Sequence, residues 1–157
     1  MLAPTDFSPE MLHKLGQNDY DWHPERSPGG PITIVISSAD KAMYVYRNGN
    51  PIGRAAVEIG GRGLTAHDKL GNHVFTMLEG TTGKPSRFTP AHEEARWMRV
   101  TSEGKAVDAD TLASRLHFSA EFADKLANEL RPGTTVIATD YPVVRKPVTQ
   151  SDVFASN

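Results

Sequence analysis

Ser114 and His117 are a serine and a histidine three residues apart, the residue types that a serine hydrolase uses as nucleophile and base. A serine becomes nucleophilic at neutral pH only when a base lies within hydrogen-bond reach. At this spacing the two side chains need not face each other, and the sequence has no Gly-x-Ser-x-Gly turn. Serine chemistry therefore stays an open but disfavoured hypothesis.

Several histidines and carboxylates could in principle gather around a metal ion: His67, Asp68, His73, His92 and Glu93. No two histidines have the His-x-x-x-His spacing that places both on one helix face. We interpret them as surface residues or as hydrogen-bonded structural residues, and we predict no metal site and no cofactor.

A glycine-rich segment, EIGGRGLTAHDKLG at 58–71, raises the possibility of phosphate binding. It follows a predicted strand, but it lacks the Lys-Ser/Thr pair of a phosphate-binding loop, and no helix is predicted to begin after it. The segment is predicted to be a loop.

Composition excludes several classes of protein. The 17 basic and 19 acidic residues are spread along the chain, which argues against a nucleic-acid partner. No apolar run is long enough to span a membrane, and the first residues, MLAPTDFSPE, do not resemble a signal peptide. The absence of cysteine excludes disulfides, thiolate metal sites and a cysteine nucleophile.

The elements that would position these residues are mostly β-strands. Alternating or β-branched apolar runs predict six strands, and Asn48-Gly49 predicts a tight turn between the second and third. The predicted strands cover 32–37, 43–47, 52–59, 73–79, 96–101 and 134–139. The polar stretch GTTGKPSRFTPAHEEA, at 80–95, is predicted to be a surface loop. A main helix at 120–130 is capped by Ser119 and stopped by Pro132-Gly133.

The ends of the chain are predicted to be less regular. Ser8 caps a short N-terminal helix that ends near Gly16, and NDYDWHPERSPGGP forms an approach loop. The tail after residue 142 is predicted to add an edge strand. The predicted organisation is therefore an N-terminal helix and approach loop at 1–30, followed by a mostly-β sheet or sandwich domain at 31–157.

Four segments in order resemble the catalytic domain of the L,D-transpeptidases, enzymes that cross-link bacterial peptidoglycan: DWHPERSPGGPITIVIS, MYVYRNGNPIGRAAVEIG, LGNHVFTMLEG and LRPGTTVIATD. The resemblance implies a β-sandwich or sheet of that type, a place in the periplasm or cell envelope, and peptidoglycan or an envelope protein as the partner. It also implies a cleft just before the main helix.

The catalytic segments of that family are missing. Family members carry a histidine in a His-x-Gly segment and a cysteine in Ser-His-Gly-Cys-x-Arg. With Arg115-Leu116 placed on the end of that motif, its serine, histidine, glycine and cysteine fall on Asp110, Thr111, Leu112 and Ala113. Asp68-Lys69 also stand where the family has Thr-Pro. No shift of this placement supplies a cysteine, so the degenerate site region is Asp110, Thr111, Leu112, Ala113, Ser114 and Arg115.

Two functions follow from this pattern. The first is a catalytically inactive binding or structural module linked to peptidoglycan. The second is an active peptidoglycan- or peptide-processing enzyme with a non-cysteine mechanism. An enzyme needs an open cleft with convergent polar groups beside residues 108–118, whereas an inactive module is free to close it. In the inactive case, Asp108 or Asp110 simply caps a short helical turn.

Binding candidates are Trp22, in the exposed-looking segment DYDWHPER, together with Arg115 and His117. For Trp22 the alternative is that it packs on the sheet and anchors the N-terminal segment. Trp97, Tyr44 and Tyr46 are predicted to fill the core or line the hairpin, with stacking on a sugar as the alternative.

Overall fold

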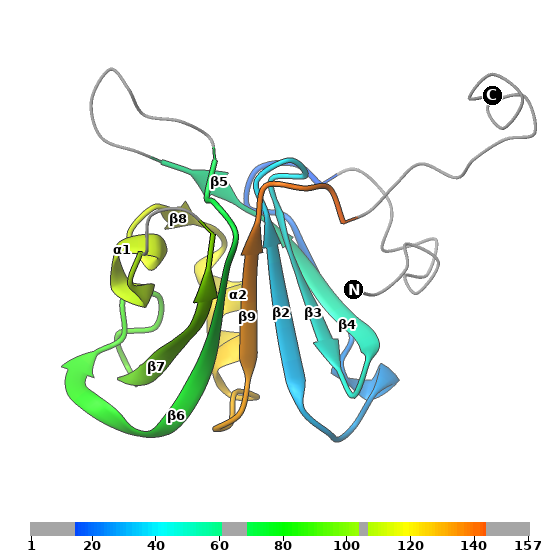
Figure 1. The fold of residues 1–157 in the computed structure, drawn as a ribbon. Helices are drawn as coiled ribbons and strands as arrows, with labels where there is room; N and C mark the ends of the chain where they lie inside the picture. The colour runs from blue at the N-terminus through cyan, green and yellow to red at the C-terminus, as the bar shows by residue number, and fades with distance from the viewer. Residues whose placement is uncertain (1–14, 61–68, 104–106, 144–157) are drawn as a thin grey trace, which may run out of the picture.

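The computed structural model describes residues 15–60, 69–103 and 107–143. Within these ranges the chain is mostly β, as predicted, with one seven-stranded mixed sheet in the order β1-β4-β3-β2-β9-β6-β7 (Figure 1). Its strands are β1 (Tyr20–Trp22), β2 (Ile32–Ser37), β3 (Ala42–Arg47), β4 (Asn50–Ala56), β6 (His73–Pro85), β7 (Glu93–Ser102) and β9 (Thr135–Thr139). A second, two-stranded sheet pairs β5 (Glu58–Ile59) with β8 (Leu116–His117).

The centre of the sheet is β2, which runs parallel to β9 and antiparallel to β3. Its side chains alternate between two buried faces, as its mostly apolar, β-branched sequence predicts. Ile34 and Ile36 join the main core, whereas Val35 belongs to a smaller cluster with Tyr44 and Tyr46. Both tyrosines are therefore core residues.

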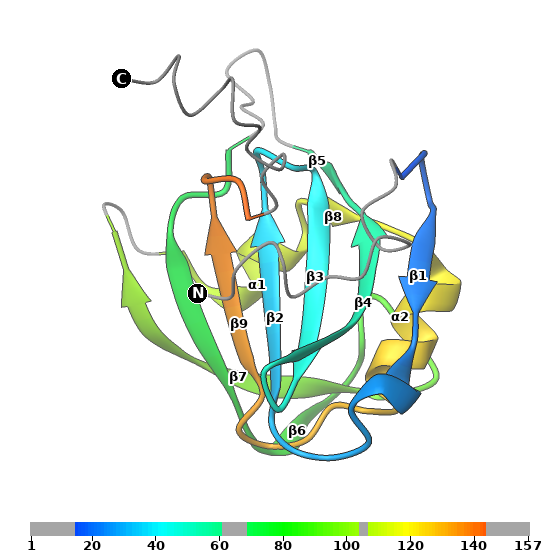
Figure 2. The same ribbon diagram turned by 90° about the vertical axis from the view of Figure 1, so that its right-hand side faces the viewer.

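Two helices cover one face of the sheet: α1 (Ala109–Ala113) and α2 (Ala120–Ala127) (Figure 2). Leu112 of α1 and Phe122 and Leu126 of α2 are buried in the same core cluster as the central strands. The side chain of Ser119 accepts a hydrogen bond from the backbone N–H of Phe122, so the predicted cap of the main helix is confirmed. None of the described helices is long and apolar enough to cross a membrane.

The main helix is shorter than predicted, because α2 ends at Ala127 rather than at residue 130. The next turn is tighter: the N–H groups of Glu129 and Leu130 donate to the carbonyls of Leu126 and Ala127, three residues back. Such i−3 bonding is common where a helix end must turn sharply, here ahead of Pro132.

The β3–β4 turn was predicted correctly. Asn48 and Gly49 have φ angles of 52° and 80°. Positive φ at both central residues is the geometry of the two-residue turn that matches the twist of the flanking strands. The predicted strand at 52–59 is instead divided into β4 and β5, with a break at Val57.

The predicted loop at 80–95 is mostly strand, which corrects the sequence-based interpretation. β6 continues to Pro85 and β7 begins at Glu93, so that only 86–92 connect them. The register shifts between Met77 and Thr81 and between Thr81 and Pro85, and Gly80 and Gly83 have positive φ. These bulges break the alternation of apolar residues that sequence reasoning depends on. Figure 1 shows the hairpin bending out of the plane of β2, β3 and β4, toward the helices.

Residues 20–22 were predicted to lie in an approach loop, but they form β1, which pairs with β4 at the edge of the sheet. Trp22 lies over Gly53: a Cβ atom there would come within 2.7 Å of the Trp22 ring. The Trp22 ring also contacts Phe122 edge-on, with ring centroids 5.6 Å apart. The Trp22 ring can thus pack directly on the backbone of Gly53 because residue 53 has no side chain.

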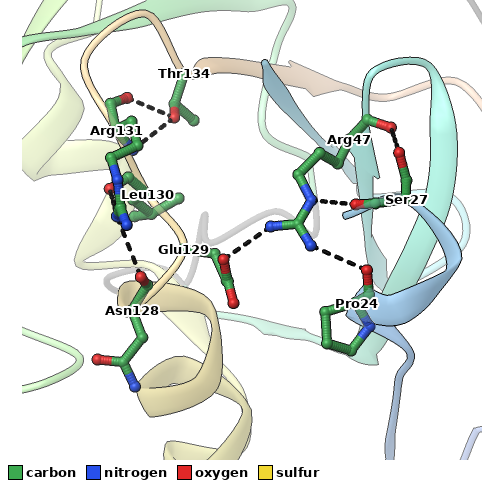
Figure 3. Close-up of polar contacts among 8 residues, drawn as sticks. All are labelled: Pro24, Ser27, Arg47, Asn128, Glu129, Leu130, Arg131 and Thr134. Atoms are coloured by element: carbon green, nitrogen blue, oxygen red, sulfur yellow. Dashed lines mark hydrogen bonds and ion pairs between the residues drawn. The ribbon is translucent and has the colours of Figure 1, made fainter. Parts of the chain in front are cut away.

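Arg47 fastens the segment after β1 to the end of α2 (Figure 3). Its guanidinium group donates to the carbonyls of Pro24 and Ser27 and to the carboxylate of Glu129. Pro24 begins a short 3₁₀-helix, η3 (Pro24–Arg26). The buried Ser27 hydroxyl donates in turn to the Arg47 carbonyl, so Ser27 and Arg47 each donate one hydrogen bond to the other's backbone carbonyl.

Three predictions fall outside the described residues: the N-terminal helix after Ser8, the centre of the glycine-rich segment at 61–68, and the tail at 144–157.

Candidate functional site: a cavity beside helix α1

The degenerate catalytic segment forms helix α1 and its caps. Asp108 is the N-cap, and its side chain accepts a hydrogen bond of 2.8 Å from the backbone N–H of Thr111. The prediction that Asp108 or Asp110 caps a short helical turn is confirmed, with Asp108 as the cap. Hydrogen bonds from Thr111 lower the pKa of the exposed Asp108 carboxyl, because they favour its charged form.

The remaining residues of the segment have structural contacts. Asp110 forms an exposed ion pair with Arg87 at 3.1 Å, and Leu112 is buried in the core. Ala113 lines a cavity. Arg115 donates from Nε to the Gly60 carbonyl at 2.7 Å and so connects α1 to the end of β5. The residues at the positions of the family motif therefore build a helix and its attachment.

Ser114 and His117 do not form a nucleophile–base pair. The Ser114 hydroxyl donates to the Thr111 carbonyl at 2.6 Å, so its proton is directed to the backbone of its own helix. His117 lies in β8, opposite Glu58, with an exposed side chain. The Nε2 atom of His117 lies 3.5 Å from the position that a Gly60 Cβ would occupy, which places the ring against residue 60. The Ser114 hydroxyl is therefore bonded within its own helix rather than to His117.

A cavity of about 570 Å³ opens beside α1, between the β6–β7 hairpin and the two helices. Its floor consists of buried core residues from the central strands and the helices: Ile34, Ile36, Met43, Phe75, Leu112 and Leu126. Its side walls are half-buried apolar residues: Met77, Phe88, Trp97, Phe118, Leu130 and Val136. The Phe88 and Phe118 rings are in contact, with centroids 4.8 Å apart.

The charged residues of the cavity lie at its rim. They come from the 86–92 connection, from the first half of β7 and from the start of α1: Arg87, Glu93, Glu94, Arg96, Asp108 and Asp110. The cleft beside 108–118 is thus open, and the part of it that β2, β3, β9 and α2 line is apolar. This arrangement can hold an apolar group. The 86–92 connection also lines it with the polar side chains of Ser86, Thr89 and His92, and in the described part of the chain no hydrogen bond joins the Ser86 or Thr89 hydroxyl to the His92 ring.

A polar cluster around Asp140 fixes the segment that leads into β6. Asp140 accepts hydrogen bonds from the Ser38 hydroxyl and from the backbone N–H groups of Leu70 and Gly71. Burial raises the pKa of Asp140, but these hydrogen bonds outweigh it, so that the pKa lies below its ordinary value. Asp140 thereby fixes the Leu70-Gly71 step, one of the segments that carry the family resemblance.

The candidate metal ligands that the structure describes are His73, His92 and Glu93. The described part of the chain contains no group of three or more histidine and carboxylate side chains that could hold a metal ion. His73 is buried, and its ring nitrogens lie within hydrogen-bond distance of the Ser102 hydroxyl and the Leu70 carbonyl. His92 lies at the cavity rim, and His67 and Asp68 are outside the described residues.

The binding candidates Trp22, Arg115 and His117 do not share a surface patch built by one element. Trp22 packs on the core and Arg115 is engaged with Gly60, which leaves His117 as the exposed member. The family resemblance implied a cleft beside 108–118, but sequence reasoning missed its apolar lining. Phe88 hinted at this lining, because a large aromatic residue in a stretch taken to be a polar loop needs an apolar environment.

Comparisons with protein families, with curated proteins and with solved structures find no match to this chain. The resemblance to the L,D-transpeptidases therefore rests on the four sequence segments alone.

Proposed function

We propose that this chain is a non-catalytic binding module of the bacterial cell envelope, built on an L,D-transpeptidase-type scaffold, that associates with peptidoglycan without cross-linking or trimming it. The observation that carries the proposal is the state of the segment 108–115. Its polar side chains cap α1, pair with Arg87 or bind the Gly60 carbonyl, and so they maintain structure.

The missing chemistry supports binding without turnover. Transpeptidation by an acyl-enzyme route needs a nucleophile, a base and donors for the oxyanion. Ala113 stands at the cysteine position, and Leu112, at the glycine position, points its side chain into the core. The hydroxyl of the adjacent residue, Ser114, donates to the Thr111 carbonyl.

A carbapenem tests the absence of acylation directly, because these compounds acylate the cysteine of the family. Intact-mass spectrometry after incubation should show no mass increase. A covalent adduct that maps to Ser114 or to any other serine would replace the proposal by the serine-enzyme alternative.

Co-sedimentation with isolated sacculi tests the association itself. We expect the protein to pellet with sacculi and His117→Ala to reduce the pelleted fraction, since the His117 side chain is exposed beside the candidate site. Trp22→Ala is the contrasting variant, because Trp22 packs against Phe122 and its loss should lower stability rather than binding. A wild-type protein that stays in the supernatant would exclude peptidoglycan as the partner.

A further inference from the structure

We propose that the cavity between the β6–β7 hairpin and the two helices binds the hydrocarbon chain of a single-chain amphiphile with a cationic head group. The ligand differs in chemistry from both the glycan and the stem peptide of peptidoglycan, so this site and its test are independent of sacculus binding.

The deep part of the cavity can accept only an apolar group. Every lining residue contributed by β2, β3, β9 and α2 is apolar, and Ile34, Ile36 and Met43 are each at most 4% exposed. A polar ligand atom placed there would lose its hydration without gaining a hydrogen bond. The side chains of Met43, in the floor, and Met77, in a side wall, are flexible and polarisable, so they can adapt to the shape of a hydrocarbon chain.

The size of the cavity is that of a ligand site rather than of a packing defect. A volume of about 570 Å³ lies inside the range of roughly 300–1,000 Å³ that is usual for small-molecule pockets. Water gains little in such a space, because apolar cavities offer it too few hydrogen-bond partners. A hydrocarbon chain instead gains the burial of each methylene group.

The charged side chains at the cavity rim determine which charge the ligand's head group should carry. Among the described residues, four carboxylates line the rim, from Glu93, Glu94, Asp108 and Asp110, together with the two guanidinium groups of Arg87 and Arg96. Arg87 is already paired with Asp110 at 3.1 Å. An anionic head group would therefore face a surplus of negative charge, and a cationic one is complementary to it.

Fluorescence of Trp97 provides the binding signal, because Trp97 lines the cavity and the only other tryptophan, Trp22, does not. A Trp22→Phe protein isolates that signal. The probes are decyl-, undecyl- and dodecyltrimethylammonium below their micelle-forming concentrations, and the matched anions are decyl and dodecyl sulfate. Each added methylene should lower Kd about fourfold until the cavity is full. At equal chain length the sulfates should bind more weakly.

Filling the cavity from α2 locates the site. Ala127→Leu places a larger side chain in the cavity and should raise Kd about tenfold or more. Ala120→Leu is the matched control, since Ala120 lies exposed on the same helix and does not line the cavity; it should leave Kd unchanged. If circular dichroism shows that Ala127→Leu is unfolded, Ala113→Leu makes the same test from α1.

The rim is tested by Glu93→Gln combined with Glu94→Gln, which should remove the preference for the ammonium over the sulfate. The absence of chain-length-dependent binding would overturn the site. Equal binding by wild type and Ala127→Leu would do the same, because the ligand would then lie elsewhere. Tighter binding of the sulfates would overturn the cationic head group.

Discussion

Replacing Arg47 by methionine should destabilise the fold by about 3 kcal/mol, because Arg47 joins two segments through buried hydrogen bonds. Its side chain is 8% exposed and donates to Pro24, Ser27 and Glu129. Methionine retains most of the side-chain volume and removes every donor. The free energy of unfolding then reports the loss of the guanidinium group rather than the loss of packing.

The magnitude follows from the three partners. A hydrogen bond from a charged donor contributes about 1.5–3 kcal/mol, and an unsatisfied buried carbonyl costs about 1–3 kcal/mol. The Pro24 carbonyl keeps a bond from the Ser27 N–H, so its loss is partial. The Glu129 side chain is 32% exposed and regains water, which limits the contribution of the ion pair at 2.8 Å. The sum therefore lies near the lower end of the roughly 3–5 kcal/mol measured when buried pairs are broken.

Urea unfolding monitored by circular dichroism measures this difference. Arg47→Lys is the matched control: it keeps the charge but cannot reach all three acceptors, and about half of the loss should remain. Glu129→Gln keeps an acceptor for the guanidinium group and should cost less than about 1 kcal/mol. If Arg47→Met were within about 0.5 kcal/mol of the wild type, Arg47 would not fasten η3 to α2, and the argument from its buried contacts would be wrong.

Three further outcomes are expected. Gly53→Ala should lower stability by about 1–3 kcal/mol in urea unfolding, because the new Cβ meets the Trp22 ring at 2.7 Å; unchanged stability would contradict this close packing. Asp140→Asn should cost about 1–2 kcal/mol at neutral pH. The pKa of Asp140 is lowered in the folded state. Its contribution to the free energy of unfolding is therefore fully present above the pKa of an unfolded aspartate, about 3.9, and is lost as the pH falls through the folded value. The stabilities of wild type and mutant should converge in acid, and a difference that stays constant with pH would refute this. Ala113→Cys should not create a transpeptidase, since an ordinary thiol with a pKa near 8.5 has no base here; cross-linking of tetrapeptide stems by this variant would show that a base survives.

The regular parts of the fold were predictable because each has a strong local cause. The apolar run of β2, the Asn48-Gly49 turn and the Ser119 cap all depend on interactions within a few residues. The strands predicted at 73–79 and 96–101 lie in β6 and β7, but their extension into 80–95 was missed because bulges near Gly80 and Gly83 interrupt the alternation. β1 was missed because three residues are too short for a period to be visible.

The candidate site was predictable only in what it lacks. The missing cysteine and the capping role of Asp108 could be read from 108–115, since both depend on local sequence. The apolar lining of the cavity could not be read from the sequence, because it comes from six separate strands and two helices whose positions are set by tertiary packing. Trp22 shows the same limit: its role as an anchor depends on Gly53 and Phe122, which are far away in the sequence.

Incubation of the purified protein with isolated sacculi, followed by sedimentation and analysis of the released muropeptides, tests the central claim most directly. We predict that the protein pellets with the sacculi and that the muropeptide profile is identical to that of sacculi alone. New cross-links or shortened stems in that profile would show turnover and contradict the account.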